Sequence, residues 1–225
     1  MKAICIIGKG GAGKTTVALN LASSLQKLGK DVVVVDANLK TPNLGLSLGI
    51  SSMVTLNDVL NDQRNINESV YIHKSGLRII PSSILLNDSD VEIGKLKEAI
   101  KDLKVDFVII DAPNLSYDAQ EAIKASDEVL VVANPDHVSI ADSLKAIKFA
   151  EANGAVVIGI LLNKTGYLDM PVKRIEEILE KPIVAKIPEN IYFKKSLKMR
   201  VPFVNLFPRN RISKNFEELA RVMTR

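Results

Sequence analysis

The sequence predicts an α/β fold in which helices flank a doubly wound, mostly parallel β-sheet. Short apolar runs that end in Gly, Asp or Asn alternate with segments whose apolar residues recur at intervals of three and four. This alternation is typical of βαβ units built around a sheet that is buried on both faces. The 225 residues are 47% hydrophobic and contain no linker or low-complexity tract, so we expect residues 1–225 to form a single domain.

The expected strands and helices follow from the period of the apolar residues. Seven apolar runs, most of them rich in Val and Ile, are the expected strands: Lys2–Ile7, Asp31–Val35, Leu77–Ile80, Val105–Ile110, Glu128–Ala133, Ala155–Leu162 and Ile183–Ile187. Four segments with helical spacing are the expected helices: Thr15–Leu28, Val91–Leu103, Ser139–Asn153 and Val172–Leu179. Gly29 and Gly154 stand where helix C-caps commonly place glycine.

The turn between the first strand and the first helix carries a phosphate-binding motif. Residues 8–15 match the pattern G-x-x-x-x-G-K-[ST] between an apolar strand and a helical segment. Glycines let the backbone N–H groups curl around phosphate oxygens, and the helix adds the positive end of its dipole. We expect Lys14 to reach the terminal phosphates and the Thr15 hydroxyl to bind Mg²⁺. The other residues expected to bind the nucleotide are Gly10, Gly11, Ala12 and Gly13.

The same loop also fits a second class of nucleotide site. Residues 8–13 spell G-x-G-x-x-G, and Asp36 ends the second strand at about the spacing of a dinucleotide-binding fold. An NAD-dependent oxidoreductase is therefore an alternative. A dinucleotide site has no use for a lysine at the start of the helix, whereas a triphosphate with Mg²⁺ needs both Lys14 and Thr15. These two residues favour a nucleoside triphosphate.

A second carboxylate supports the triphosphate interpretation. Residues 105–111 form a buried-strand pattern that ends in Asp111, the arrangement of a strand whose terminal acid holds the magnesium shell. A strand-end Asp that merely starts a turn is also common in α/β proteins. We expect Asp111 to belong to the magnesium site because the sequence also contains the phosphate loop.

Taken with these residues, the loop resembles a known family. Residues 9–16 are similar to K-G-G-x-G-K-[ST]-[ST], the motif of the deviant Walker A ATPases of the MinD/ParA group, and Thr16 joins the expected nucleotide-binding residues. The resemblance looks most like the MinD branch, including its archaeal-type members. It continues through short motifs along nearly the whole chain, among them 35–39, 111–113, 132–135, 162–164 and 187–189.

The resemblance implies an ATPase that works as an ATP-dependent homodimer and positions or regulates an unidentified partner, in processes such as cell division. Lys9 would cross the dimer interface to the partner's phosphates. The expected catalytic residues are Lys9, Lys14 and Asp36. Asn163 and the backbone around Pro188 would contact adenine. The expected cofactors are ATP or ADP and Mg²⁺.

The resemblance also assigns the metal residues and the moving segments. Thr15, with Asp36 and Asp111 acting through water, would hold Mg²⁺. Asp36 would lie in switch I and Asp111 in switch II, the segments that move when the terminal phosphate is lost.

Two departures from the family pattern affect catalysis. Members usually carry Asp-x-Asp after the second strand, whereas this chain has Asn38 at the second position. Asn can hydrogen-bond a water but can neither supply charge nor take a proton, so we predict slow hydrolysis. Asn114 and Leu115 alter the switch II pattern Asp-x-Pro-Ala-Gly. An ATP-dependent adaptor that does not hydrolyse ATP is therefore a further alternative.

Several classes of protein are excluded or disfavoured. Cys5 is the only cysteine, which excludes an internal disulfide and the cysteine-ligated metal clusters of some family relatives. No apolar run approaches the roughly 20 residues of a membrane span. We expect a cytoplasmic protein, with peripheral attachment to membrane or nucleoid left open. His73 and His137 stand alone and are assigned no role.

The net charge of +4 hides an asymmetry. Residues 192–225 contain nine Lys or Arg and two Glu, so this segment carries +7 and the rest carries −3. A stripe of Ile212, Phe216, Leu219 and Met223 favours a final helix docked on the sheet over an amphipathic membrane anchor. The basic residues are either a solvated face or a salt-sensitive contact with anionic membrane or nonspecific DNA.

Overall fold

The computed structural model describes residues 1–50, 53–85, 91–166 and 170–224. The strands of these residues form an eight-stranded sheet in the order β3-β4-β2-β5-β1-β6-β7-β8, in which β3 is antiparallel to β4 and the other pairs are parallel. The predicted doubly wound α/β fold is therefore confirmed. The strands are β1 (Lys2–Gly8), β2 (Val32–Asp36), β3 (Tyr71–Ile72), β4 (Arg78–Ile80), β5 (Phe107–Asp111), β6 (Glu128–Ala133), β7 (Val156–Thr165) and β8 (Ile183–Pro188).

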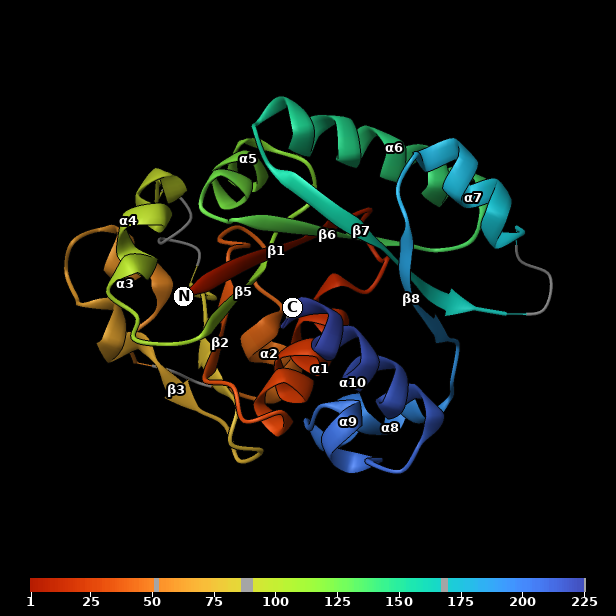
Figure 1. Ribbon diagram of the computed structural model, residues 1–225. Helices are drawn as coiled ribbons and strands as arrows, with labels where there is room; N and C mark the ends of the chain where they lie inside the picture. Colours follow the sequence, from red (N-terminus) through yellow and green to blue (C-terminus); the bar gives the residue numbers. More distant parts are fainter. Residues whose placement is uncertain (51–52, 86–90, 167–169, 225) are drawn as a thin grey trace.

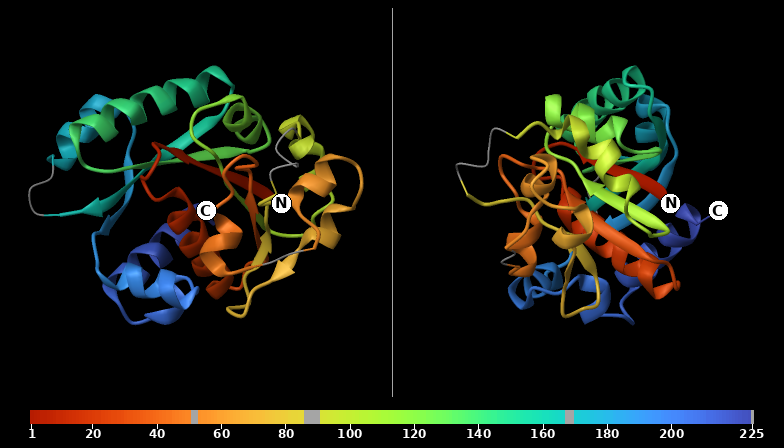
Figure 2. Two further views of the ribbon diagram at one scale, coloured as in Figure 1. Left: turned by 180° about the vertical axis from the view of Figure 1, so that it is seen from behind. Right: turned by 90° about the vertical axis from the view of Figure 1, so that its left-hand side faces the viewer.

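Helices cover both faces of the sheet (Figures 1 and 2). Alternate residues of β1 show why: Ala3, Cys5 and Ile7 join the apolar core on one face, while Ile4 and Ile6 join the core on the other. A strand buried on both sides must be apolar throughout, as this one is. The helices on the first face are α3 (Leu56–Leu60), α4 (Leu96–Lys101), α5 (Tyr117–Lys124), α6 (His137–Ala152) and α7 (Val172–Leu179). The helices on the second face are α1 (Lys14–Lys27), α2 (Leu44–Leu48), α8 (Tyr192–Met199), α9 (Phe203–Leu206) and α10 (Arg211–Met223).

Most predicted elements lie within two residues of their observed bounds. Both predicted C-cap glycines have a positive φ, +79° at Gly29 and +78° at Gly154, which is the left-handed conformation that ends a helix. The helix expected at 91–103 is wrong in extent, because Ile93–Lys95 is a 3₁₀ turn and α4 begins only at Leu96. Gly94 lies in that turn, where glycine weakens the α-helical conformation.

The C-terminal helix docks on the sheet as the apolar stripe predicts. Ile212, Phe216, Leu219 and Met223 are all buried, and α10 packs against α1 and β8. The membrane-anchor alternative would require this face to be free. Among the described residues, no helix has both the length and the apolarity to cross a membrane.

Candidate functional site

The phosphate loop joins β1 to α1 at the carboxyl edge of the sheet. From β2 to β5 the chain builds on one side of β1, and from β6 to β8 it builds on the other. Ligands of open α/β sheets bind at such a switch point. Ala12 donates its backbone N–H to the carbonyl of Lys9 at 3.1 Å, which curls residues 9–13 into a tight turn before α1.

Two glycines in this loop are required by close packing. Gly8 has φ +147°, and a Cβ there would lie 2.2 Å from the carbonyl oxygen of Val132 on β6. Gly13, at φ +100°, is the N-cap of α1, and a Cβ there would lie 2.3 Å from the Nδ2 atom of Asn163. The loop can therefore pack this closely against β6 and the end of β7 only because these two positions have no side chain.

Lys14 turns back over the loop that it follows. Its ammonium donates to the carbonyls of Gly8 at 3.0 Å and Lys9 at 3.4 Å, and to Oδ1 of Asn114 at 3.0 Å. Burial lowers the pKa of Lys14, and the nearby Asp111 carboxyl opposes that shift. The ammonium is thus held at the mouth of the loop, where a terminal phosphate would meet it.

Thr15 and the two predicted acids come together beneath the loop. The Thr15 hydroxyl donates to Oδ2 of Asp111 at 2.6 Å. Asp36 and Asp111 are paired neighbours in the register of β2 and β5, and both are buried. Sequence spacing alone does not place them side by side, because 74 residues separate them along the chain and β5 must insert between β1 and β2.

The two carboxyls differ in what holds them. Asp36 accepts the backbone N–H of Asn38 at 3.1 Å and that of Leu44 at 3.0 Å, so both of its oxygens organise the segment that leads into α2. Burial, together with the charge of Asp111, raises the pKa of Asp36. Burial also raises the pKa of Asp111, against the lowering effects of the Thr15 hydroxyl and the Lys14 ammonium.

These residues fit a magnesium ion bound partly through water. Oδ1 of Asp111 is buried and has no hydrogen-bond partner among the described residues, which is costly unless a ligand or water satisfies it. Two adjacent buried carboxyls resist ionising together, and a divalent cation removes that conflict. Mg²⁺ usually keeps several waters, so Thr15 and Asp111, with Asp36 behind them, suffice as its protein partners.

Lys9 points away from its own loop toward α6. Its ammonium lies 3.4 Å from Oδ2 of Asp142, and both side chains are about one-third exposed, at 38% and 32%. The hydrogen bond from Lys9 comes first among the causes that lower the pKa of Asp142, with Lys145 adding to it. In this conformation Lys9 is therefore an ion-pair partner within its own subunit, through a contact that solvent screens and weakens.

The predicted adenine residues lie at the other end of the loop. Nδ2 of Asn163 donates to the carbonyl of Ala12 at 2.7 Å, and Nζ of Lys164 donates to the carbonyl of Gly11 at 2.8 Å. The end of β7 thus braces the phosphate loop, a role the sequence reasoning missed for Lys164. Pro188 ends β8 beside them.

Asn38, the departure from the family pattern, folds its own loop. Its Nδ2 donates to the carbonyl of Thr41 at 2.6 Å, while its Oδ1 accepts from the Thr41 hydroxyl at 3.1 Å and from the Thr41 N–H at 3.2 Å. Both ends of the amide are engaged in this turn.

A cavity of about 550 Å³ joins these groups. The phosphate loop lines it together with Asp111, Asn114, Asn163 and Pro188. Residues of α8, Phe193 and Leu197 among them, close the side, and no motif in the sequence pointed to them. A nucleotide fits this volume and this polarity.

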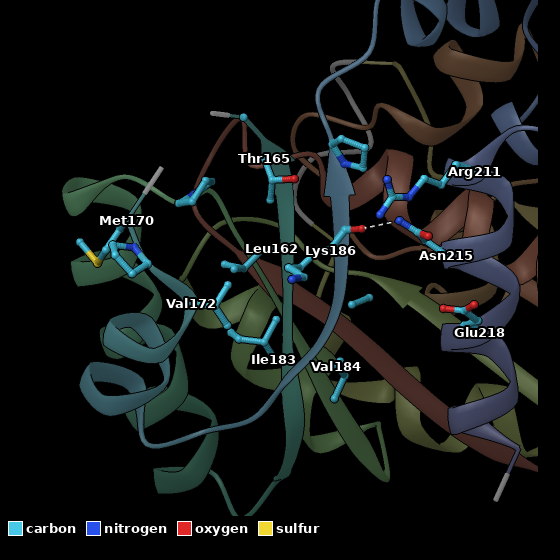
Figure 3. Close-up of a pocket in the computed structure, with 15 residues that line it drawn as sticks. Leu162, Thr165, Met170, Val172, Ile183, Val184, Lys186, Arg211, Asn215 and Glu218 are labelled. Atoms are coloured by element: carbon cyan, nitrogen blue, oxygen red, sulfur yellow. Dashed lines mark hydrogen bonds between the residues drawn. The ribbon is translucent and has the colours of Figure 1, made fainter. Parts of the chain in front are cut away.

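A second cavity, of about 660 Å³, flanks β8 (Figure 3). Pro188 lines both cavities. Asn215 of α10 reaches across it and donates to the carbonyl of Lys186 at 2.7 Å. The carboxylate of Glu176 accepts the N–H of Ile183 at 3.0 Å, so side chains cover this sheet edge at two points. Neither the phosphate loop nor the buried acids line this cavity.

The strand order argues against the dinucleotide alternative. In that fold the strand before the glycine-rich loop pairs with the strand that follows it in the chain. Here β5 lies between β1 and β2. Asp36, which would have to reach a ribose, is fully buried and engaged with backbone N–H groups.

Comparison with known proteins shows the family to which this chain is similar. A family described as an AAA domain matches residues 1–152. An uncharacterized ATP-binding protein of Methanocaldococcus jannaschii is 35% identical over 221 residues, covering 95% of this chain and 83% of that protein.

Two solved structures of cell-division proteins have the same fold. The cell division ATPase MinD of Pyrococcus furiosus superposes with a TM-score of 0.93 at 33% identity, covering 99% of this chain and 98% of that one. The septum site-determining protein MinD of Pyrococcus horikoshii, solved with Mg-ADP, gives a TM-score of 0.92 at 30% identity, with coverage of 99% and 95%.

Proposed function

Because the chain belongs to the MinD/ParA family of P-loop ATPases, we propose that it binds ATP with Mg²⁺ and hydrolyses it slowly, as an ATP-switched homodimer that positions or regulates a partner. One observation carries the proposal. Lys14, Thr15 and Asp111 meet at the mouth of the phosphate loop, with an unpartnered buried oxygen of Asp111 beside them. The Mg-ADP bound by the Pyrococcus horikoshii relative supports the choice of ligand.

In the proposed mechanism, residues 10–16 hold the phosphates with their backbone N–H groups and the N-terminus of α1. Lys14 exchanges its carbonyl contacts for the terminal phosphates and neutralises the charge that develops as water attacks. Thr15, with Asp36 and Asp111 acting through water, would hold Mg²⁺, which would supply positive charge at the phosphate oxygens.

We infer that Lys9 couples this site to dimerisation. In one subunit its ammonium pairs with Asp142, and that partly exposed contact is weak enough to be exchanged for a phosphate. When two subunits meet around ATP, the partner subunit's Lys9 would complete the neutralisation of the triphosphate, so that dimer formation depends on the nucleotide.

Calorimetry with ATP, ADP and NAD, with and without Mg²⁺, tests the ligand. We expect Mg²⁺-dependent binding of ATP and ADP; binding of NAD in preference to both would overturn the proposal. Size-exclusion chromatography tests the dimer. ATP should shift the wild type to a dimer, Lys9→Ala should stay monomeric, and Asp142→Asn should dimerise at least as readily as the wild type.

The turn formed by Asn38 and Thr41 supports slow turnover, because Oδ1 of Asn38 already accepts two hydrogen bonds and is not free to accept one from an attacking water. It equally supports the second candidate, an adaptor that binds ATP without hydrolysing it. Single-turnover assays separate the two. Asn38→Asp should raise the rate, whereas a wild-type rate typical of the family with no gain from Asn38→Asp would contradict the reasoning.

We propose further that residues 1–225 act as one cytoplasmic domain and that basic side chains of the C-terminal segment contact an anionic surface. Lys194, Lys195, Lys198 and Arg200 are exposed together on and after α8. Binding to anionic vesicles or to DNA should weaken steeply with added salt. Binding that ignores salt, or that is absent at low salt, would count against this contact.

A further inference from the structure

The Asn114 side chain lies over the phosphate loop. Its Oδ1 accepts from the Lys14 ammonium at 3.0 Å. A Cβ built on Gly10 would lie 3.1 Å from Nδ2 and 3.3 Å from Oδ1 of the same amide, so the amide covers the Cα of Gly10. Asn114 follows β5 and α1 follows β1, so this contact joins two segments that are 100 residues apart in the chain.

Asn114 differs from the other partners of Lys14 because it lies outside the phosphate loop. The ammonium has three hydrogens and, among the described residues, three acceptors: the carbonyls of Gly8 and Lys9, and Oδ1 of Asn114. The two carbonyls belong to the loop itself. Asn114 is exposed and comes from another segment, so its contact can stay in place while the ammonium exchanges a loop carbonyl for a phosphate oxygen.

An amide at this position can do more than hold the lysine. An ammonium only donates, so the oxygen of the amide faces Lys14 and Nδ2 is left with two N–H groups. Among the described residues nothing accepts a hydrogen bond from this Nδ2. Asn114 lines the cavity together with Lys14, Thr15 and Asp111. A phosphate-loop lysine serves the last two phosphates, so the terminal phosphate lies beside the Lys14 ammonium.

We propose that Asn114 recognises the terminal phosphate. Its Oδ1 orients Lys14 while its Nδ2 donates a hydrogen bond to a γ-phosphate oxygen, so the site binds the triphosphate more tightly than the diphosphate. This inference rests on the proposed ATP binding and adds a binding residue to it. A hydrogen bond to a charged oxygen is worth about a tenfold or greater difference in affinity. A nucleoside diphosphate has no γ-phosphate and receives no such bond.

The rival role is a latch that merely holds Lys14 while the loop is empty. Removing a latch would strengthen the binding of both nucleotides or leave it unchanged. Asn114→Ala should instead weaken a nonhydrolysable MgATP analogue about tenfold and leave MgADP within about twofold. Asn114→Asp keeps the size and the contact with Lys14 but repels the γ-phosphate, so it should weaken the ATP analogue more than Asn114→Ala does.

Calorimetric titration of the wild type and both variants with MgADP and the nonhydrolysable MgATP analogue tests the proposal. Tyr117→Ala, an exposed change at the start of α5 just after the loop that contains Asn114, is the control for local disturbance and should keep the wild-type ratio of affinities. Repeating the titrations in a Lys9→Ala background keeps dimerisation out of the measured affinity. Circular dichroism checks that each variant is folded.

The outcomes separate the two levels of inference. If the wild type binds neither nucleotide, the proposed function fails and this inference fails with it. If the wild type binds both, and Asn114→Ala keeps the wild-type ratio of ATP to ADP affinity, the proposed function stands and Asn114 is not a γ-phosphate residue. A parallel loss for both nucleotides in Asn114→Asp alone would likewise overturn the inference in favour of the latch.

Discussion

Replacing Phe216 by alanine tests whether α10 is part of the folded core. Phe216 is completely buried and packs with the core that α1 forms on one face of the sheet. In the docked arrangement the loss of its ring leaves a cavity between α10 and α1. In the membrane-anchor alternative the ring would be free, and its loss would cost the fold nothing.

The magnitude follows from the buried area. A buried phenylalanine removes about 150–250 Å² from water, worth about 4–6 kcal/mol at about 25 cal/mol per Å². This is an upper bound because an unfolded chain already buries part of that surface. Measured Phe→Ala changes in cores cost about 3–5 kcal/mol, which is our expectation here. Because domains are stable by only about 5–15 kcal/mol, the loss should be conspicuous.

Urea denaturation followed by circular dichroism measures the change. Val222→Ala is the matched control, since Val222 lies on the same helix with 44% of its surface exposed and should cost at most about 0.5 kcal/mol. If Phe216→Ala is no more destabilising than Val222→Ala but reduces binding to anionic vesicles, α10 is an anchor and the docking argument is refuted.

Three further predictions address the site and the fold. Asp111→Asn should reduce the gain in ATP affinity on adding Mg²⁺ by about tenfold or more, seen by calorimetry; an unchanged gain would remove Asp111 from the metal shell. Gly13→Ala should abolish detectable nucleotide binding and cost about 1–3 kcal/mol, whereas Gly29→Ala, also at positive φ but with open space around it, should leave binding intact. Burial, with Lys74 nearby, lowers the pKa of His73 in the folded state. Near the unfolded pKa of about 6.5 the unfolded state therefore binds more protons than the folded state, and the free energy of unfolding should fall as the pH drops from 7.5 to 5.5. The fall should be smaller in His73→Asn, and equal pH profiles would contradict the assignment.

Local patterns predicted the elements well where local forces decide them. The strand at residues 2–7 and the helix at 172–179 were predicted to within a residue, because continuous apolar runs and helical spacing report burial directly. β3 was missed because it has two exposed residues and exists only through its pairing with β4. The short helices α2, α3 and α9 were missed because four or five residues carry too little periodicity.

The residues of the site also fall into those that a local sequence pattern predicts and those that only long-range contacts bring together. The motif at 8–15 was readable because glycines, a lysine and a threonine must occur at a fixed spacing in one loop. Asn163 and Lys164 donate hydrogen bonds to that loop from a strand about 150 residues later, so no local sequence pattern predicts these contacts. The role of Asn114 depends in the same way on β5 lying next to β1.

The sequence by itself determined that this protein is an α/β phosphate-loop protein with a lysine, a threonine and two strand-end acids suited to Mg²⁺ and a triphosphate. Only the tertiary structure decided that β5 inserts between β1 and β2, which sets Asp36 beside Asp111 and brings Asn114 over Lys14. It also decided that Lys9 pairs with Asp142 on α6. The physical reason is that spacing along a chain reports local geometry, whereas strand order results from burying both faces of one sheet at once.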